Sequence, residues 1–297
     1  MLPRPWGAGA FEVGMSVIVP DPTLQAGETT MRTDERMWPV TSSDTREVAT
    51  PDGPGLLHVA APDQVRGVLL LGGGHSGQVR TVDLDAVAAE LPGHGWAVVT
   101  YELPWRVAGR KVGPRPPASD PAWLCGVEAV RATWPGVPVV TGGRSAGARI
   151  ACRTWDADLA GVVALSFPLH PPGKPAQSRL GELAPVGVPV LLVSGARDPF
   201  GSPAELEQAL AEPQAGPREL VVVAGATHSF PAARGRARGG GGRRVRRAAR
   251  RRPLGLTLVV AGRILDPRCP CGRASMRRLR HRVNARRSTP RCSTQTI

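Results

Sequence analysis

The segment that most constrains the fold is a strand-like run that passes through a glycine-rich turn into a helical pattern. Val137–Thr141 is rich in branched apolar residues, and a helical pattern runs from Ser145 to Trp155. Gly143 and Gly147 flank the serine at two residues' distance, a G-x-S-x-G arrangement typical of a nucleophile elbow. The serine backbone of such an elbow is strained, so these neighbours must lack side chains. The turn raises the hydroxyl above the sheet edge, where the helix N-terminus favours a developing negative charge.

Strand-like and helical patterns alternate on both sides of this turn. Arg46–Thr50 and Leu56–Ala60 indicate a hairpin, and from Val68 onward apolar runs alternate with helices. Continuous apolar strands are typical of a parallel sheet that is covered on both faces. We therefore expect an α/β three-layer sandwich with a mostly parallel sheet, and no large lid because residues 168–187 are too few to form one. The expected strands are 46–50, 56–60, 68–71, 96–101, 137–141, 159–167, 188–194 and 219–223, and the expected helices are 83–91, 122–134, 145–155, 178–183 and 202–211.

The distribution of charge divides the chain into three parts. Residues 233–297 contain 20 arginines, no lysine and one acidic residue, Asp266. The whole chain has 38 basic and 24 acidic residues and a net charge of +14. Residues 1–232 therefore contain 18 basic and 23 acidic residues, which gives this part a net charge of −5. We expect a loose leader over residues 1–40, the α/β domain over residues 41–232, and a disordered Arg/Gly-rich tail over the rest. One hypothesis for this tail is an out-of-frame reading of the gene.

The tail also bears on the partners of the chain. Its arginines suit the phosphates of nucleic acid, but no aromatic residue is interleaved with them, so we expect at most nonspecific contact. Its longest apolar run, residues 253–262, is far shorter than the roughly 20 residues of a membrane helix. The N-terminus lacks the pattern of a signal peptide. We therefore expect a cytoplasmic protein that has no membrane partner.

Two more polar residues follow predicted strands in the second half of the domain. Asp198 comes just after the strand of residues 188–194, and His228 just after the strand of residues 219–223. Together with Ser145 they give the chain order serine, acid, histidine, which is the order used by α/β-hydrolases. Parallel strands end at one edge of the sheet, so all three side chains are expected to meet there. In this arrangement His228 accepts the serine proton, and Asp198 fixes the imidazole tautomer.

A nucleophile of this kind also needs donors for the oxyanion that forms during the reaction. We expect one donor to be the backbone N–H of Ala146, directly after the serine. The second is expected from the glycine-rich loop after the strand of residues 68–71, at His75 or Gly74.

Two patterns that suggest a cofactor or a metal are weak. Residues 72–77 match G-x-G-x-x-G after a strand and Glu102 closes the next strand, which permits a dinucleotide site. That pattern has low specificity in a chain with 36 glycines, and it leaves the serine, acid and histidine unexplained. Cys269 and Cys271 form a lone C-x-C pair without the second pair that a zinc site needs. We expect no cofactor and no metal.

Five segments carry a family resemblance over residues 45–232. They are Pro104–Arg110 (PWRVAGR), Gly142–Arg149 (GGRSAGAR), Phe167–Gly173 (FPLHPPG), Arg197–Gly201 (RDPFG) and Thr227–Phe230 (THSF). With these segments the chain resembles the dienelactone-hydrolase-like α/β-hydrolases, and in particular the bacterial group related to the testis-expressed and NSL-complex hydrolase-like proteins. The resemblance implies the α/β-hydrolase fold and the same triad. It also implies that Arg106 and His170 face the site and bind substrate.

The chain departs from this family at two places. The family has His-Gly after its third strand, where this chain has Gly73 and Gly74, so the oxyanion loop is expected to differ in shape. The family also continues past the triad histidine into a last amphipathic helix that covers the sheet. This chain instead enters Arg/Gly-rich sequence shortly after His228, which predicts a sheet face that is left exposed.

These observations lead to one main hypothesis and one alternative. The main hypothesis is a serine hydrolase that cleaves a small-molecule ester, thioester or amide through an acyl-enzyme on Ser145. The alternative is a catalytically silent scaffold with the same fold that binds a protein partner. Covalent labelling by a fluorophosphonate distinguishes the two, because only an activated serine reacts with it.

Overall fold

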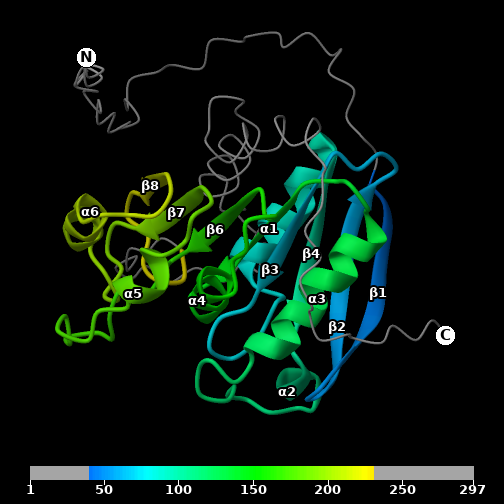
Figure 1. The fold of residues 1–297 in the computed structure, drawn as a ribbon, viewed down its shortest axis with the longest axis horizontal. Helices are drawn as coiled ribbons and strands as arrows, with labels where there is room; N and C mark the ends of the chain where they lie inside the picture. The colour runs from blue at the N-terminus through cyan, green and yellow to red at the C-terminus, as the bar shows by residue number, and fades with distance from the viewer. Residues whose placement is uncertain (1–39, 231–297) are drawn as a thin grey trace, which may run out of the picture. The chain divides into compact units, whose positions relative to one another are not determined.

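A computed structural model describes residues 40–230, with the side chains of residues 40–43 left out. The sequence predictions for residues 1–39 and 231–297, including the cysteine pair and the arginine-rich tail, therefore lie outside the described residues. The described part contains one eight-stranded sheet in the order β1-β2-β4-β3-β5-β6-β7-β8, which runs in Figure 1 from blue β1 to yellow β8. The strands are β1 (Val40–Thr50), β2 (Gly53–Pro62), β3 (Gly67–Gly72), β4 (Trp96–Glu102), β5 (Val139–Arg144), β6 (Gly161–Leu165), β7 (Val190–Gly195) and β8 (Arg218–Val223).

The sheet is mostly parallel, as the alternating pattern predicts. β1 and β2 form an antiparallel hairpin, and β2 also pairs antiparallel with β4. Every other pair, from β4–β3 through β7–β8, is parallel. The carboxyl ends of β3 to β8 therefore share one edge of the sheet, and the loops that follow these strands are neighbours there.

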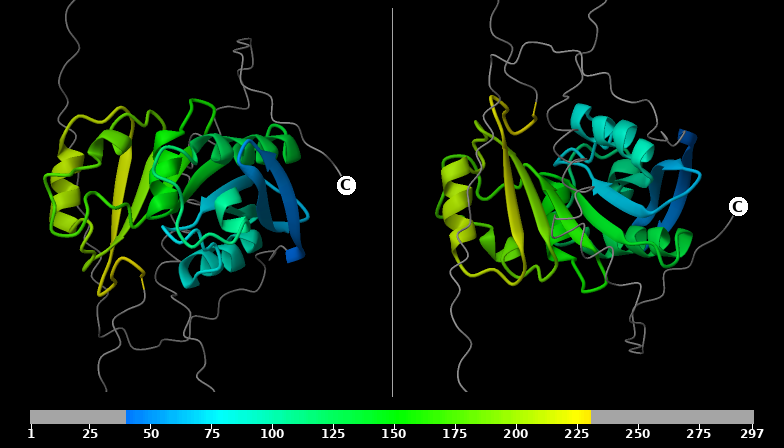
Figure 2. Two further views of the ribbon diagram at one scale, coloured as in Figure 1. Left: turned by 90° about the horizontal axis from the view of Figure 1, so that it is seen from below. Right: turned by 90° about the horizontal axis from the view of Figure 1, so that it is seen from above.

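Helices cover both faces of the sheet. On one face α3, α4, α5 and α6 contribute buried side chains, and on the other face α1 and η1 do so. Figure 2 shows these layers from two opposite sides, with α1 across the sheet from α3 and α4. The predicted three-layer α/β sandwich is thus confirmed. The helices are α1 (Val82–Glu90), η1 (Leu91–His94), α2 (Pro104–Val107), α3 (Asp120–Thr133), α4 (Ala146–Arg153), α5 (Leu180–Leu183) and α6 (Pro203–Ala211).

The central strands explain why their sequences are continuous apolar runs. In β3 all six residues are buried. Val68 and Leu70 pack in the core cluster under α3 and α4, whereas Leu69 and Leu71 pack in the cluster under α1. Both faces of a central strand thus require apolar side chains, and no polar alternation remains.

Several element boundaries differ from the sequence prediction. The short helix α2 lies at residues 104–107, outside the helices expected from the sequence, and it begins at Pro104, whose fixed φ suits a first helical turn. The strand predicted over residues 159–167 is shorter, because pairing with β5 and β7 covers only β6. Among the described residues no helix is both long enough and apolar enough to cross a membrane.

Candidate active site

The turn between β5 and α4 holds Ser145 in an unusual backbone conformation. Its φ is 53° and its ψ is −103°, a combination that residues with a side chain rarely adopt. The serine N–H donates a hydrogen bond of 2.9 Å to the carbonyl of Leu165 on the neighbouring strand, which holds the turn in place. A Cβ built on either Gly143 or Gly147 would overlap the carbonyl oxygen of Gly72. Both glycines are therefore required by close backbone packing against β3.

Asp198 and His228 lie at the same sheet edge and form a hydrogen-bonded chain with the serine. The Nε2 atom of His228 lies 2.9 Å from the Oγ of Ser145. Its Nδ1 atom lies 2.8 Å and 3.0 Å from the two carboxylate oxygens of Asp198. The side chain of the aspartate is 1% exposed and that of the histidine 17% exposed. The structure thus brings together the three residues that the sequence singles out.

Two further contacts fix the imidazole and the carboxylate. The ring of Phe200 stacks on the imidazole of His228, with 4.1 Å between ring centroids. The backbone N–H of Phe200 donates to the Oδ1 of Asp198 at 2.9 Å. When Nδ1 carries the proton and donates to the carboxylate, Nε2 is free to accept from the serine hydroxyl. The contacts hold the ring in the orientation that a general base requires.

Arg144 connects the elbow to the loop that carries the histidine, a role that sequence reasoning missed. Its Nη2 donates to the Oγ of Ser229 at 2.6 Å, next to His228. Its Nε lies 3.5 Å from the carboxylate of Asp83 on α1, whose side chain is only 3% exposed. The arginine occupies the variable position before the serine in G-x-S-x-G, so its place in that motif was the only available signal.

The residues expected to supply oxyanion donors lie at a pocket of about 370 Å³ beside the nucleophile. Gly74, His75 and Ala146 all line this pocket. A Cβ built on Gly74 would lie 3.9 Å from the Cβ of Ser145, so the glycine-rich loop passes close to the serine. That loop turns through a hydrogen bond of 2.8 Å from the N–H of Gly77 to the carbonyl of Gly74.

Comparison with known proteins agrees with this geometry. Residues 65–242 match the family model described as an alpha/beta hydrolase domain. The chain belongs to the alpha/beta hydrolase domain family. The match begins just before β3 and includes Ser145, Asp198 and His228. No curated protein sequence matches the chain.

Solved structures show the alpha/beta hydrolase fold as well. An alpha-beta serine hydrolase homologue from Coxiella burnetii is 19% identical, with a TM-score of 0.53 over 64% of this chain and 91% of that one. A hyperthermophilic esterase from the archaeon Pyrobaculum calidifontis is 16% identical, with a TM-score of 0.53 over 65% and 79%. Est1E from Butyrivibrio proteoclasticus, bound to ferulic acid, is 15% identical, with a TM-score of 0.54 over 74% and 98%. At these identities the likeness establishes the fold.

Arg106 and His170 do not line the pocket of this alpha/beta hydrolase domain. The Nε of Arg106 lies 3.5 Å from a carboxylate oxygen of Glu102. His170 is buried, with its Nε2 atom 3.2 Å from the carboxylate of Glu205 and its Nδ1 atom 2.8 Å from the carbonyl of Pro171. Their binding of substrate remains a prediction from the family resemblance.

Other potentially reactive groups in the described part of the domain are less suited to catalysis than Ser145. Burial raises the pKa of the Cys152 thiol to about 12, so this cysteine is a poor nucleophile near neutral pH. Within residues 40–230 there is no group of three or more His, Cys, Asp or Glu side chains that could hold a metal ion. Ser145 is therefore the nucleophile candidate that the geometry favours.

Proposed function

We propose that the protein is a serine hydrolase that cleaves a small ester, thioester or amide through an acyl-enzyme on Ser145. The observation that carries this proposal is the continuous hydrogen-bonded chain from the Ser145 hydroxyl through His228 to the buried Asp198, with links of 2.9 Å and 2.8 Å. An activated nucleophile is recognised by a base within hydrogen-bond reach and a third group that orients the base.

The reaction follows from these positions. His228 removes the proton of the serine hydroxyl as the oxygen attacks the substrate carbonyl. Asp198 stabilises the imidazolium that forms. The oxyanion receives hydrogen bonds from the backbone N–H of Ala146 and from that of Gly74 or His75. His228 then donates its proton to the leaving group, and a water molecule activated by the same imidazole releases the acyl group.

Labelling with a fluorophosphonate probe tests this proposal directly. The full chain is expected to be labelled stoichiometrically, and Ser145→Ala is expected to abolish labelling. Ser178→Ala is the matched control, because Ser178 is exposed and lies in the loop before α5. A full chain that retains its helical circular dichroism but is neither labelled nor active on 4-nitrophenyl acetate would instead support the silent scaffold.

Finer assignments rest on the sequence. We place the chain with the dienelactone-hydrolase-like enzymes, in the bacterial group related to the NSL-complex hydrolase-like proteins, on the five segments that carry the resemblance. A cytoplasmic location and a nonspecific contact of residues 233–297 with nucleic acid remain predictions. If the tail binds nucleic acid through its arginines, the affinity will fall steeply with salt.

A further inference from the structure

The pocket and His228 lie on opposite sides of β5, the strand that leads to Ser145. The pocket is lined by the segments that follow β3 and β4 and by α4. Asp198 and His228 instead follow β7 and β8, and β5 lies between these groups in the sheet order. The leaving group must sit next to the Nε2 of His228, because that atom supplies its proton. The acyl group of a bound ester is therefore directed to the other side, into the pocket.

The wall of this pocket is mainly apolar and aromatic. Trp123, Tyr101 and Ile150 line it and are almost fully buried, and Trp105 and Leu103 line it as well. A volume of about 370 Å³ is at the lower end of the range for small-molecule sites, so it suits a small group rather than a long chain. Transfer of an apolar acyl group from water to such a wall is favourable.

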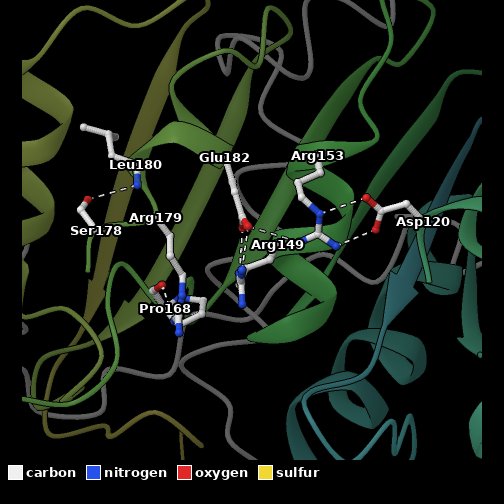
Figure 3. A network of polar contacts seen from close by, with 8 residues as sticks. All are labelled: Asp120, Arg149, Arg153, Pro168, Ser178, Arg179, Leu180 and Glu182. Carbon is white, nitrogen blue, oxygen red and sulfur yellow. Dashed lines mark hydrogen bonds and ion pairs between the residues drawn. The ribbon is translucent and has the colours of Figure 1, made fainter. Parts of the chain in front are cut away.

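Two arginines on α4 also line the pocket, but both are already paired. Arg149 donates to the two carboxylate oxygens of Glu182 at 2.7 Å and 2.6 Å. Arg153 donates to both oxygens of Asp120 at 3.0 Å and 2.6 Å, and it lies 3.5 Å from Glu182. In Figure 3 Glu182 lies between the two arginines and Asp120 lies on the far side of Arg153. Two cations thus face two anions.

The pairing changes what the pocket can accept. Each bidentate pair occupies the Nε and Nη2 donors of its arginine and offsets the positive charge of the guanidinium. All four side chains are at most 20% exposed, so water contributes little screening there. Arg115, the third arginine that lines the pocket, is exposed, so solvent and salt weaken its field. A carboxylate carried deep into the pocket would therefore lose its hydration next to arginines whose positive charge is already offset by Glu182 and Asp120.

We propose that this pocket binds an uncharged, apolar acyl group of the substrate, and that the pairs Arg149–Glu182 and Arg153–Asp120 exclude acyl groups that carry a second carboxylate. This inference rests on the proposed hydrolase function, whose nucleophile and base it takes as given. It adds the substrate class and assigns Glu182 and Asp120 as specificity determinants that act through the arginines.

A series of 4-nitrophenyl esters tests the apolar part of the proposal. From acetate to hexanoate, kcat/KM is expected to rise about threefold per added methylene, because each buried CH₂ gains hydrophobic transfer free energy. Val112→Trp, at the mouth of the pocket, is expected to remove this rise while acetate is still cleaved. Val82→Trp is the matched control: the two valines are 55% and 59% exposed, but only Val112 lines the pocket. A flat chain-length profile in the native enzyme would overturn this part.

The charge part is tested with two six-carbon acyl groups, the hexanoate ester and the mono-4-nitrophenyl ester of adipate. The native enzyme is expected to prefer hexanoate by at least about tenfold in kcat/KM, because the second carboxylate is buried unpaired. Glu182→Gln leaves Arg149 without its carboxylate and is expected to lower this preference about tenfold. Asp120→Asn does the same for Arg153, and serves if the first variant fails to fold. Two folded variants with an unchanged preference would refute the role of the pairs.

A binding measurement separates failure of this inference from failure of the proposed function. Ser145→Ala cannot turn over, and Trp105 and Trp123 in the pocket wall report binding through their fluorescence. 3-Phenylpropionamide is expected to bind at least about tenfold more tightly than its para-carboxylate analogue, with both affinities measured from this fluorescence change. If the native chain hydrolyses none of the esters but Ser145→Ala keeps this binding preference, only the hydrolase function is rejected. Equal binding of the two amides would instead reject the pocket assignment.

Discussion

The two strands that lead to the nucleophile and to the base differ sharply in their surroundings. β5 lies between β3 and β6, and all its residues but the last are buried. β8 lies at the edge of the sheet with β7 as its one neighbour. None of its residues is buried, and Val222 is 39% exposed. One candidate site is thus assembled from a buried central strand and a partly exposed edge strand of the sheet.

The difference shows that the two halves of the site are held by different forces. The conformation of Ser145 follows from backbone packing, because Gly143 and Gly147 lie so close to the backbone of Gly72 that neither position has room for a side chain. The position of His228 depends instead on a few side-chain contacts beyond the edge strand, to Asp198, Phe200 and, through Ser229, to Arg144. Perturbing β5 should therefore cost stability, whereas perturbing the contacts of the histidine should cost rate.

The largest effect is expected from Asp198→Asn. The amide is isosteric with the carboxylate, but its NH₂ favours the imidazole tautomer with the proton on Nε2, which cannot accept from the serine. We expect kcat to fall by about 10⁴-fold while the melting temperature stays nearly unchanged. Steady-state hydrolysis of 4-nitrophenyl acetate and a thermal melt measure the two quantities. Asp52→Asn, in the exposed turn between β1 and β2, is the control and should behave as the native chain. An Asp198→Asn enzyme with native kcat would show that this carboxylate does not orient the base.

The next largest effect is expected on stability, from Gly147→Ala. The added methyl would overlap the carbonyl oxygen of Gly72, so the elbow or β3 must shift. We expect a loss of about 3 kcal/mol in the free energy of unfolding, measured by urea denaturation. Gly181→Ala is the matched control, because it is also a helical glycine but has no atom within 4 Å of the added Cβ. That variant should be neutral or slightly stabilising. Equal losses in the two variants would contradict the packing argument.

The contrast between the interior and the edge of the sheet is measured by one substitution made twice. Val163→Ala removes two methyl groups from β6, where the side chain is fully buried, and should cost about 2 kcal/mol of stability. Val222→Ala makes the same change on β8, where the side chain is partly in water, and should cost less than about 0.5 kcal/mol. If both variants unfold at the same urea concentration, the edge strand is covered more fully than its exposure indicates.

The same contrast explains which parts of the molecule could be predicted from sequence. The strands of the central sheet were predictable, because a strand covered on both faces needs a continuous apolar run such as residues 68–71. Ser145, Asp198 and His228 were predictable because each lies in the turn or loop that follows a predicted strand, at the edge where the strands end. Local sequence therefore suffices wherever one strand fixes the position of one residue.

Side-chain contacts outside the triad whose partners are remote in the sequence were not predictable. The contact of Arg144 with Ser229 joins residues 85 positions apart, and no local pattern signals it. Arg149 and Arg153 lie one helical turn apart, but their partner Glu182 belongs to α5 and Asp120 to α3. The contacts of the His170 ring with Glu205, 35 positions away, and with the carbonyl of Pro171 were not predicted either, and its role toward substrate stays a prediction. Side-chain networks between elements depend on tertiary packing, which a one-dimensional pattern does not contain.

The smallest effect, and the most direct test of how the base is held, is expected from Ser229→Ala. This change removes the acceptor of the 2.6 Å hydrogen bond from Arg144 without altering the triad itself. The loop that carries His228 then loses a link to the elbow, and misplacement of a catalytic group lowers the rate. We expect kcat to fall about tenfold with an unchanged KM and melting temperature, because Ser229 is exposed and contributes no packing. Ser178→Ala, which also removes an exposed serine hydroxyl with a single local hydrogen bond, should leave kcat unaltered. A native kcat for Ser229→Ala would mean that Asp198 and Phe200 alone suffice to hold the imidazole beyond the edge strand.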